Sequence, residues 1–358
     1  MKSRRPILGL TMGDPAGIGP EICLRALREP SVLQRCVPVL FGDANVVASV
    51  RETLGRRDGA APLPDLDAVR CLSEAVWAGS PEISEPIIVD CRATDDAQQI
   101  EPGKISPQCG RAAYVCIEKA IHAALAGKLD GVVTAPIHKE SLHLSGVPFP
   151  GHTEIFTALT GARRSCMMLY SDKLTVSMVT THIGYGEVPG KLSVERIFNV
   201  IELTAEAMQR LSRRKPRLAI CGLNPHAGEH GLFGNREEEN FIVPAMRQAR
   251  ERGISIEGPL PPDAAFTTNV RRKFDAIVTL YHDQGHIPFK MLAFDTGVNV
   301  TLGLPIIRTS VDHGTAFDIA WQGQADATSL FSAISVAADL ACGRQNDSRP
   351  APEAAALP

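Results

Sequence analysis

The chain has 358 residues, of which 44% are hydrophobic and 22% charged, so it can build a sizeable core divided between two packed lobes. The net charge of -3 and the 5% aromatic content argue against general attraction to nucleic acid or anionic membranes and against a base-stacking surface. No stretch approaches the ~20 apolar residues of a transmembrane helix, and the N-terminal apolar run is too short for a secretory signal. Nine cysteines without a CxxC pair indicate free thiols in a reducing cytoplasm rather than disulfides or a cysteine zinc site.

The expected elements alternate between strands and helices along the chain. Residues 6–11 form a buried strand, and a glycine-rich turn leads into a helix from about Pro20. Further strands are expected at 37–41, 130–136, 165–170, 174–181, 217–221 and 275–280, with helices at 107–127, 193–213, 235–252 and 328–342. The polar segments 55–68 and 92–107 are expected to be loops, and 343–358 a disordered tail. This alternation predicts an α/β fold with a largely parallel sheet, to which the hairpin turn at 171–173 adds antiparallel strands.

Three histidines come after predicted strands. His182 follows residues 174–181, His226 comes shortly after 217–221, and His282 comes shortly after 275–280. In parallel α/β sheets ligands bind beyond the carboxyl ends of strands, so these imidazoles are expected to converge. Three imidazoles would leave a metal ion an open position for a substrate oxygen. The alternative is that each histidine only hydrogen-bonds its own loop.

Other polar residues surround these histidines. Asp283 directly follows His282, and we expect it to orient that ring by a hydrogen bond or to transfer protons. A cap of the local turn is the alternative. His230 and His286 lie in the same loops and are expected to be loop or rim residues.

An anion-binding segment is expected at GHTE, residues 151–154. Thr153 is expected to cap the helix that follows, so that free N–H groups and His152 face an anion. The alternative is a capped helix with no ligand. Lys139, in TAPIHKE at another strand end, is a further basic candidate, unless it is only a solvated loop residue.

Two more basic residues are candidates for the same anion. Arg308 ends the apolar run VTLGLPII, where an arginine is expected to pair with a protein carboxylate or a ligand phosphate. Lys290 is the second candidate, and Asn299 lies in the segment that leads to Arg308.

The first loop, GDPAGIG at 13–19, is neither a GxGxxG fingerprint nor a P-loop. Its glycines are therefore a weak signal for a nucleotide site. The alternative is that they serve only the tight turn between strand and helix.

A set of motifs resembles the 4-hydroxythreonine-4-phosphate dehydrogenase family. The motifs, in order from residue 8 to about 342, are GDPAGIGPE, TAPIHK, GHTE, TTH, GLNPHAGE, YHDQG and GVNVTLGLPIIRTSVDHGTA. The resemblance implies a two-lobed fold similar to isocitrate and isopropylmalate dehydrogenases, with a mostly parallel mixed sheet and an active-site cleft between the lobes. Residues 1–342 would form one catalytic unit of two intertwined lobes. The resemblance also implies a homodimer with shared active sites and NAD bound without a conventional Rossmann fingerprint.

The resemblance also assigns roles to residues. The matching metal ligands are His182, His226 and His282, with one ligand contributed by the partner chain. The residues that match the family's substrate binders are His152, Thr153, Lys290, Asn299 and Arg308. NAD would take hydride from the carbon that bears the 3-hydroxyl, and the resulting β-keto acid would lose CO2. A divalent metal (Zn, Mg, Mn or Co) would assist both steps, and Lys290 or Asp283 would manage the protons. No individual NAD contact is assigned, although the loops at 224–234 and 297–308 are candidates.

Three segments look more like a catabolic branch of this family than like its pyridoxine-biosynthetic members. They are GEHGLFG (228–234), YHDQGHI (281–287) and HGTAFDIA (313–320). That branch oxidises D-threonate or D-erythronate 4-phosphate, whereas the biosynthetic substrate is 4-hydroxy-L-threonine 4-phosphate. The substrates differ mainly in a hydroxyl or an amine at carbon 2. A relative that acts on a cis-dihydrodiol of terephthalate lacks the GHTE motif, so His152 and Thr153 argue against that substrate.

Two other functions fit the same residues. A non-catalytic phosphate- or metal-binding protein on this scaffold would keep the histidines without needing NAD. A metal-dependent hydrolase would use a metal-bound hydroxide and would be active without NAD.

Overall fold

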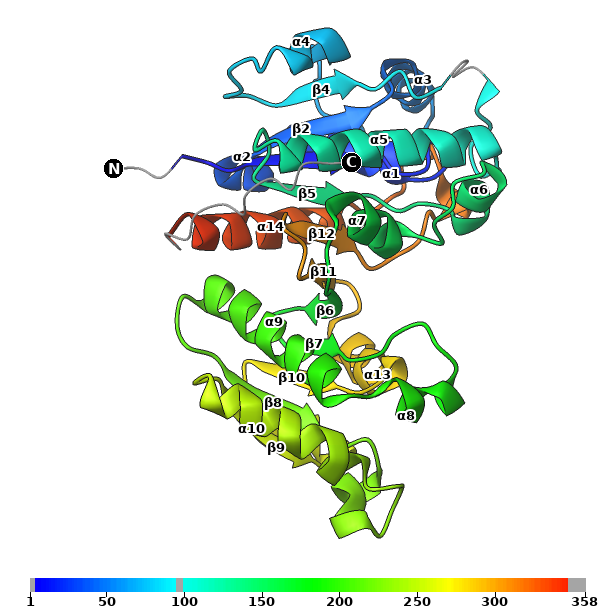
Figure 1. Cartoon of the computed structure of the whole chain (residues 1–358). Coiled ribbons are helices and arrows are strands. Elements are labelled where there is room, and N and C mark those ends of the chain that lie inside the picture. The colour runs from blue at the N-terminus through cyan, green and yellow to red at the C-terminus, as the bar shows by residue number, and fades with distance from the viewer. Residues whose placement is uncertain (1–3, 95–98, 347–358) are drawn as a thin grey trace.

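A computed structural model describes residues 4–94 and 99–346, and its strands form one twisted 12-stranded sheet in the order β3-β4-β2-β1-β5-β12-β11-β6-β7-β10-β8-β9 (Figure 1). The strands are β1 (Ile7–Thr11), β2 (Val37–Gly42), β3 (Arg70–Ser73), β4 (Ile87–Asp90), β5 (Gly131–Thr134), β6 (Cys166–Tyr170), β7 (Thr175–Met178), β8 (Arg217–Cys221), β9 (Ser255–Leu260), β10 (Ala276–Thr279), β11 (Val298–Leu302) and β12 (Arg308–Val311).

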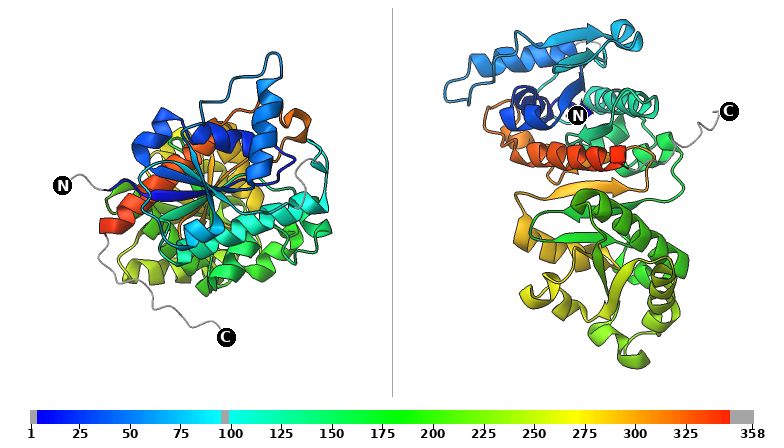
Figure 2. Two further views of the ribbon diagram at one scale, coloured as in Figure 1. Left: turned by 90° about the horizontal axis from the view of Figure 1, so that it is seen from above. Right: turned by 90° about the vertical axis from the view of Figure 1, so that its left-hand side faces the viewer.

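Helices cover the sheet (Figure 2). They are α1 (Gly19–Ala26), α2 (Pro30–Arg35), α3 (Ala44–Gly55), α4 (Glu74–Ala78), α5 (Pro107–Leu125), α6 (Lys139–Leu144), α7 (His152–Thr160), α8 (Val188–Lys191), α9 (Val194–Ser212), α10 (Val243–Glu251), α11 (Pro262–Ala265), α12 (Thr268–Arg271), α13 (His282–Ala293) and α14 (Thr328–Asn346). Short 3-10 helical segments are η2 (Tyr185–Glu187), η3 (Pro225–Gly231) and η5 (Phe317–Ile319), and η4 (Glu238–Ile242) is one turn of the wider π-helix.

The strand directions divide the sheet into two parallel blocks. From β3 to β12 all neighbours are parallel, and from β7 to β9 all neighbours are parallel again. Between the blocks, β11 and β6 pair antiparallel with their neighbours and with each other. The predicted α/β fold with a mostly parallel mixed sheet is confirmed, and so is the predicted hairpin, formed by β6 and β7.

The chain visits these blocks out of sequence order. It builds β1–β5 in the upper half of Figure 1, crosses to build β6–β10 in the lower half, and returns through β11 to place β12 and α14 above. We call these parts the upper and lower halves. The return strands β11 and β12 are therefore the structural link between them, and residues from distant parts of the sequence meet there.

Both faces of the central strands are buried, which is why their sequences are continuous apolar runs. All five residues of β1 are buried, as are all six of β2. Such runs are typical of parallel strands covered by helices on both sides. The long helices α5 and α9 present buried stripes to the sheet, and Ser193 caps α9 by accepting from Arg196 N at 3.1 Å.

Several elements differ from the sequence expectation. The strand expected at 174–181 ends at Met178, and the helix expected at 235–252 is a wide turn (η4) followed by α10. Pro244 stands in the first turn of α10, where its missing N–H costs nothing. The last helix, α14, continues to Asn346, beyond residue 342, and the remainder of the expected tail lies outside the described residues. No helix in the described part of the chain has the length and apolar character to cross a membrane.

The glycine loop at 13–19 is buried, and its glycines meet steric needs of the turn. Gly13 has a φ of +75°, and a Cβ there would lie 2.4 Å from the Pro136 carbonyl oxygen. A Cβ on Gly19 would lie 2.2 Å from the Met12 carbonyl oxygen. These contacts support the reading in which the glycines permit close packing of strand and helix.

Asp14 is a carboxylate enclosed in this loop. Its Oδ1 accepts a hydrogen bond from Ala16 N at 2.9 Å, and the residue is fully buried. Burial raises its pKa from 3.8 to about 6, although the Ala16 amide and neighbouring donors partly counteract this. The folded protein therefore binds a proton at Asp14 in a pH range where the unfolded chain has lost it.

We expect Asp14→Asn to flatten the pH dependence of stability between about pH 4 and 6. Since the folded-state pKa is raised, the contribution of Asp14 is present below pH 3.8 and lost as the pH rises through about 6. A pKa difference of about 2 corresponds to about 3 kcal/mol. Denaturant unfolding of wild type and variant at several pH values measures this difference. Substitution of the exposed Asp58 by Asn is the control and should not change the slope.

Candidate active site

The start of α7 exposes free backbone N–H groups beside His152. The N-cap is Gly151, which has no side chain, so the prediction that Thr153 caps this helix is wrong. Thr153 lies instead within the first turn, beside His152. The Nε2 atom of His152 is buried without a hydrogen-bond partner. Burial and the nearby Arg308 charge hold the pKa of this ring well below its usual range, so the ring is neutral.

Arg308 carries a buried positive charge at the first position of β12. Its Nη1 and Nη2 atoms donate to Thr301 Oγ1 and Thr134 Oγ1, each at 2.8 Å, and its guanidinium lies 5.5 Å from the Phe156 ring centre. The residue is 3% exposed, its Nε has no partner, and no ion pair joins it to a carboxylate anywhere in the described chain. Burial lowers its pKa to about 9, which the charge of Glu154 only partly offsets. Because an uncompensated buried charge costs several kcal/mol, a bound anion would stabilise this guanidinium.

Asn299 lies on β11, the strand beside Arg308. The antiparallel register places Thr301 opposite Arg308 and Asn299 opposite Ser310. Asn299 and Thr301 are two residues apart, so they face the same side of the sheet. The Oδ1 atom of Asn299 is also buried without a partner. Three of the predicted substrate residues thus present buried polar atoms that nothing in the described structure satisfies.

His182 and His282 lie together near the carboxyl ends of β7 and β10. Their ring centres are 5.7 Å apart. The Nδ1 atom of His282 lies 2.7 Å from Asp283 Oδ1, which leaves Nε2 available as a ligand. A carboxylate on the far nitrogen is the usual way in which a metal-binding imidazole is oriented. This pair of histidines and its carboxylate fit the chemistry of a divalent metal site.

His286 belongs to this group, contrary to the expectation that it is a rim residue. Its ring stacks on His282 with centres 3.7 Å apart, and it is buried. Because a carbonyl oxygen can only accept, the His286 Nδ1 atom donates to the His282 carbonyl at 3.2 Å. His286 therefore fixes one side of the His282 ring.

His226 is not brought to the other two histidines. It lies in η3, where residues 226–230 all have positive φ, and its ring centre is 6.0 Å from that of Phe233. Across residues 4–94 and 99–346, no three His, Cys, Asp or Glu side chains are grouped so that they could hold a metal ion. One copy of the chain thus assembles two of the three predicted ligands.

Two lysines complete the surroundings. The Nζ atom of Lys290, on α13, lies 3.5 Å from Asp312 Oδ2. Lys139 lies against the start of α7, with its Cε atom 3.9 Å from where a Cβ of Gly151 would stand. Burial, and after it the charge of Lys139, lowers the pKa of His182. Lys139 therefore lies between the anion-binding end and the histidine pair.

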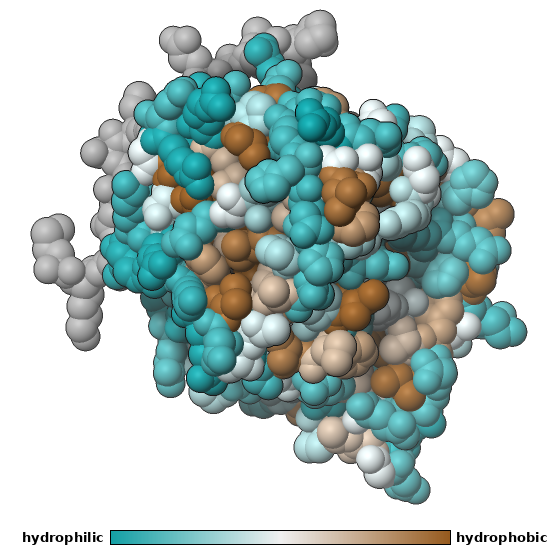
Figure 3. All heavy atoms as spheres, turned by 90° about the horizontal axis from the view of Figure 1, so that it is seen from below, coloured by the Kyte–Doolittle hydropathy of each residue, from teal (hydrophilic) through white to brown (hydrophobic). Residues whose placement is uncertain are grey.

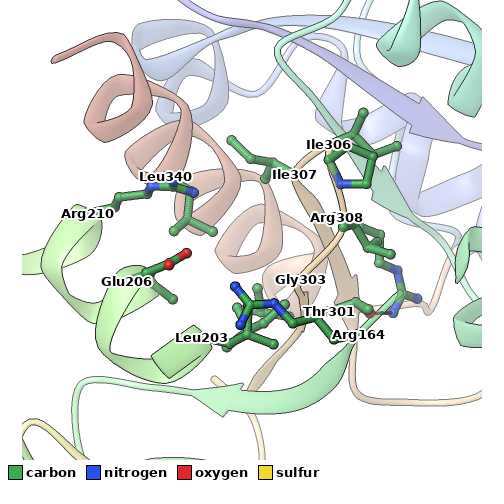
Figure 4. A pocket seen from close by; sticks show the side chains of 15 residues that line it. Arg164, Leu203, Glu206, Arg210, Thr301, Gly303, Ile306, Ile307, Arg308 and Leu340 are labelled. Carbon is green, nitrogen blue, oxygen red and sulfur yellow. Dashed lines mark hydrogen bonds between the residues drawn. The ribbon is translucent and has the colours of Figure 1, made fainter. Parts of the chain in front are cut away.

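A cavity of about 200 Å³ lies elsewhere, between α9, α14 and the segment 303–307 (Figure 4). Of the predicted catalytic, metal-binding and substrate-binding residues, Arg308 alone borders it, and residues 300–307 of the candidate NAD segment also line it. In Figure 4 the Arg308 side chain points away from Glu206 and Arg210, which line the cavity. The cavity is thus separate from the site that the guanidinium serves.

Comparison with known proteins identifies the family. Residues 34–337 match the family described as pyridoxal phosphate biosynthetic protein PdxA. The chain belongs to the PdxA family. It is 44% identical to a D-threonate 4-phosphate dehydrogenase of Salmonella typhimurium, with 93% of this chain and 98% of that protein covered.

Other PdxA proteins are equally similar. A 4-hydroxythreonine-4-phosphate dehydrogenase of Desulfosudis oleivorans is 44% identical, over 94% of this chain and 96% of that protein. The crystal structure of a 4-hydroxythreonine-4-phosphate dehydrogenase from Klebsiella pneumoniae superimposes with a TM-score of 0.80, at 39% identity, covering 95% of this chain and 99% of that one. PdxA relatives of both names are thus similar to this chain along nearly its whole length.

Sequence reasoning missed the residues that hold these groups in place. Thr134 and Thr301 fix the Arg308 guanidinium, and Asp312 pairs with Lys290. Thr134 is the first residue of TAPIHK and lies within the strand predicted at 130–136, and Thr301 lies inside the motif that contains Asn299. Their positions were available in the sequence, but threonine is common in strands, so residue type alone did not distinguish them.

We expect inorganic phosphate to stabilise the wild-type protein and not Arg308→Met. A ligand that binds only the folded state raises the free energy of unfolding by about 2.7 kcal/mol at 100 times its Kd. Thermal unfolding with and without phosphate measures this effect. Replacement of the exposed Arg217 by Met is the matched control and should leave the phosphate effect intact. Equal stabilisation of Arg308→Met and wild type would contradict an anion at Arg308.

Proposed function

We propose that this PdxA protein is an NAD-dependent, divalent-metal-dependent dehydrogenase that oxidises and decarboxylates a 4-phosphorylated 3-hydroxy acid. The observation that carries the proposal is the buried, uncompensated Arg308 charge beside the unpartnered His152 and Asn299 atoms. A phosphate dianion matches Arg308 and His152, because a guanidinium, an imidazole N–H and free helix N–H groups all donate to its oxygens. The Asn299 Oδ1 atom is an acceptor, so it is left for a hydroxyl of the substrate.

The proposed substrate extends from this anion site to the histidine pair. The start of α7 with His152, Thr153 and Arg308 would hold the phosphate, and Asn299 would bind a neighbouring group. His182 and His282 would hold a metal with His282 oriented by Asp283. When bound, the metal would polarise the substrate's hydroxyl and ketone oxygens, and NAD would accept the hydride.

Lys290 is the better candidate for moving protons. One oxygen of Asp283 is engaged by the His282 ring at 2.7 Å, so this carboxylate serves mainly to orient the histidine. Lys290 lies two helical turns further along α13 with its ammonium directed to Asp312 between the two halves. A lysine so placed can protonate the carbon left after loss of CO2.

The candidate substrates differ in the group at carbon 2, which is a hydroxyl in D-threonate and D-erythronate 4-phosphate and an amine in 4-hydroxy-L-threonine 4-phosphate. The relatives described above carry the names of both activities, while the segments at 228–234, 281–287 and 313–320 resemble the catabolic branch. We therefore propose D-threonate or D-erythronate 4-phosphate as the preferred substrate over 4-hydroxy-L-threonine 4-phosphate. The free cysteines support a reducing, cytoplasmic setting for this reaction.

We expect NADH to form when the protein is mixed with NAD, a divalent metal and one of these 4-phosphates. The hydroxyl-bearing substrates should show the higher kcat/KM, and the corresponding acids without phosphate should be poor substrates because Arg308 then lacks its partner. NADH absorbance measures the rate, and carbon dioxide release confirms decarboxylation. Phosphate binding without any turnover would instead favour a non-catalytic binding protein. Bond cleavage in the absence of NAD would favour a metal-dependent hydrolase.

We further propose a homodimer that shares its active sites. Ile287 and Met291 on α13, and Phe294 directly after it, face solvent and are 57%, 80% and 70% exposed. This apolar stripe neighbours the face that carries His282 and Lys290. Apolar patches are also visible on the surface shown in Figure 3. A second copy that covers the stripe would bury apolar area next to the site and could supply the missing His226.

We expect a mixture of His226→Ala and His282→Ala subunits to recover activity that neither variant has alone. If His226 comes from the second copy, one site of each mixed dimer has a complete set of ligands. Random exchange makes half of the dimers mixed, so about a quarter of wild-type activity should return. Activity after subunit exchange measures the recovery. No recovery in dimers proved to be mixed would mean that each chain uses its own His226.

A further inference from the structure

An ion pair joins the two halves of the sheet beside the candidate site. Lys290 lies on α13 in the lower half, and Asp312 directly follows β12 in the upper half (Figure 1). Lys290 Nζ and Asp312 Oδ2 are 3.5 Å apart. The Asp312 side chain is 17% exposed and that of Lys290 is 41% exposed, so the carboxylate is the better enclosed partner.

The lysine needs such a partner because its own helix does not fix its ammonium. His282, His286 and Lys290 follow at four-residue intervals, so they share one face of α13. Phe289 and Ala293 follow His286 and Lys290 by three residues each, so they are buried on the same side of the helix and anchor that side. Lys290 nevertheless has a flexible four-carbon stem, and its Nζ lies only 5.7 Å from the largely exposed Phe294 ring. The Asp312 carboxylate in the upper half holds the Lys290 side chain in one orientation.

The carboxylate is itself well placed. Strand β12 begins with Arg308 and ends one residue before Asp312, so one short strand carries the anion-binding guanidinium and the partner of Lys290. Strand β12 is held by hydrogen-bonded pairing with β5 on one side and β11 on the other. The distance between the phosphate end and the lysine end of the site is therefore set by rigid backbone.

We propose that Asp312 is a positioning residue for Lys290 that holds its ammonium between the two halves, next to the histidine pair. This inference rests on the proposed function for the role of Lys290 in the reaction. A partly exposed ion pair contributes only about 0–1 kcal/mol to folding. The ion pair therefore orients the Lys290 ammonium and contributes little to folding stability. Its loss should lower the reaction rate far more than the melting temperature.

The first test compares three variants with the wild type in the NADH assay. Asp312→Asn should lower kcat/KM roughly 10- to 100-fold, the loss that a misplaced catalytic group can cause, with little change in melting temperature. Asp312→Glu should recover most of the activity, because it restores the carboxylate. Asp318→Asn removes an exposed carboxylate from the same segment and should behave as wild type. Wild-type kinetics in Asp312→Asn would overturn the inference.

A double-mutant cycle shows whether Asp312 acts through Lys290. In the Lys290→Ala background, the Asp312→Asn change should have almost no further effect on kcat/KM, because the group it positions is absent. Losses that multiply would mean that Asp312 acts independently, and the positioning role would be rejected.

A measurement without turnover separates this inference from the proposed function. An amine-reactive label, followed by peptide mass spectrometry, reports how available Lys290 is. We expect the labelling rate of Lys290 to rise several-fold in Asp312→Asn, while the rate at Lys273 stays unchanged. If no 4-phosphate is oxidised by the wild type but Lys290 labelling changes as expected, the proposed function fails and the contact stands. An unchanged labelling rate of Lys290 in Asp312→Asn would show that Asp312 does not hold the Lys290 ammonium.

Discussion

The buried charge of Arg308 is the constraint around which the candidate site is arranged. Its guanidinium is fixed by two threonine hydroxyls, Thr301 on β11 and Thr134 on β5, neither of which neutralises it. Hydroxyls orient a cation at low cost but leave its charge unbalanced in a region of low dielectric. The protein therefore accepts a less favourable folded state in the absence of ligand. An anion that bound beside Arg308 would neutralise this charge, and the electrostatic energy released would add to its affinity, because the guanidinium is already fixed in place.

The sheet topology explains how the two ends of the site come to face each other. Strands β12 and β11 run antiparallel at the point where the two parallel blocks meet. The upper block contributes α7 and Arg308, and the lower block contributes His182 and His282. Each strand of a sheet is rotated relative to its neighbour. The carboxyl ends of the strands in the upper block are therefore rotated relative to those in the lower block. The antiparallel pair is thus both a structural joint and the place where the anion-binding residues lie.

Much of the fold was predictable because its signals are local. Buried runs such as residues 6–11 and 217–221 and the periodic stretch at 107–127 mark strands and a helix without knowledge of partners. The proximity of His182 and His282 also followed from a rule about strand ends. The strands β11 and β12 were not assigned, because VNVTLGLPIIRTSV reads as one apolar run. Gly303, with a φ of +86°, and Pro305 lie where the chain reverses between the two strands.

The less predictable parts depend on contacts between distant segments. The contact between Asp312 and Lys290 joins the two halves of the fold, and no local pattern in the sequence indicates it. The stacking of His286 on His282 does have a local signal, their four-residue spacing, but this signal is informative only once a helix is assigned at 282–293. The cap of α7 was misassigned because Thr153 is a good capping residue, yet the chain enters the helix through Gly151. Propensity identified the helix start to within two residues, but which residue caps it depends on the direction from which the preceding segment arrives.

The turn that carries His226 has a consequence of its own. Four residues with side chains, His226, Ala227, Glu229 and His230, adopt left-handed backbone angles in succession. Each such residue costs of the order of 1–2 kcal/mol relative to a right-handed conformation. Glu238 restrains the start of this segment, because its Oε1 accepts a hydrogen bond from Asn224 N at 2.8 Å. The left-handed run that carries His226 is therefore held in an unfavourable backbone conformation by the hydrogen bond from Asn224 N to Glu238, two residues before the histidine. Loss of the Glu238 carboxylate would allow this run to relax and would displace the His226 ring.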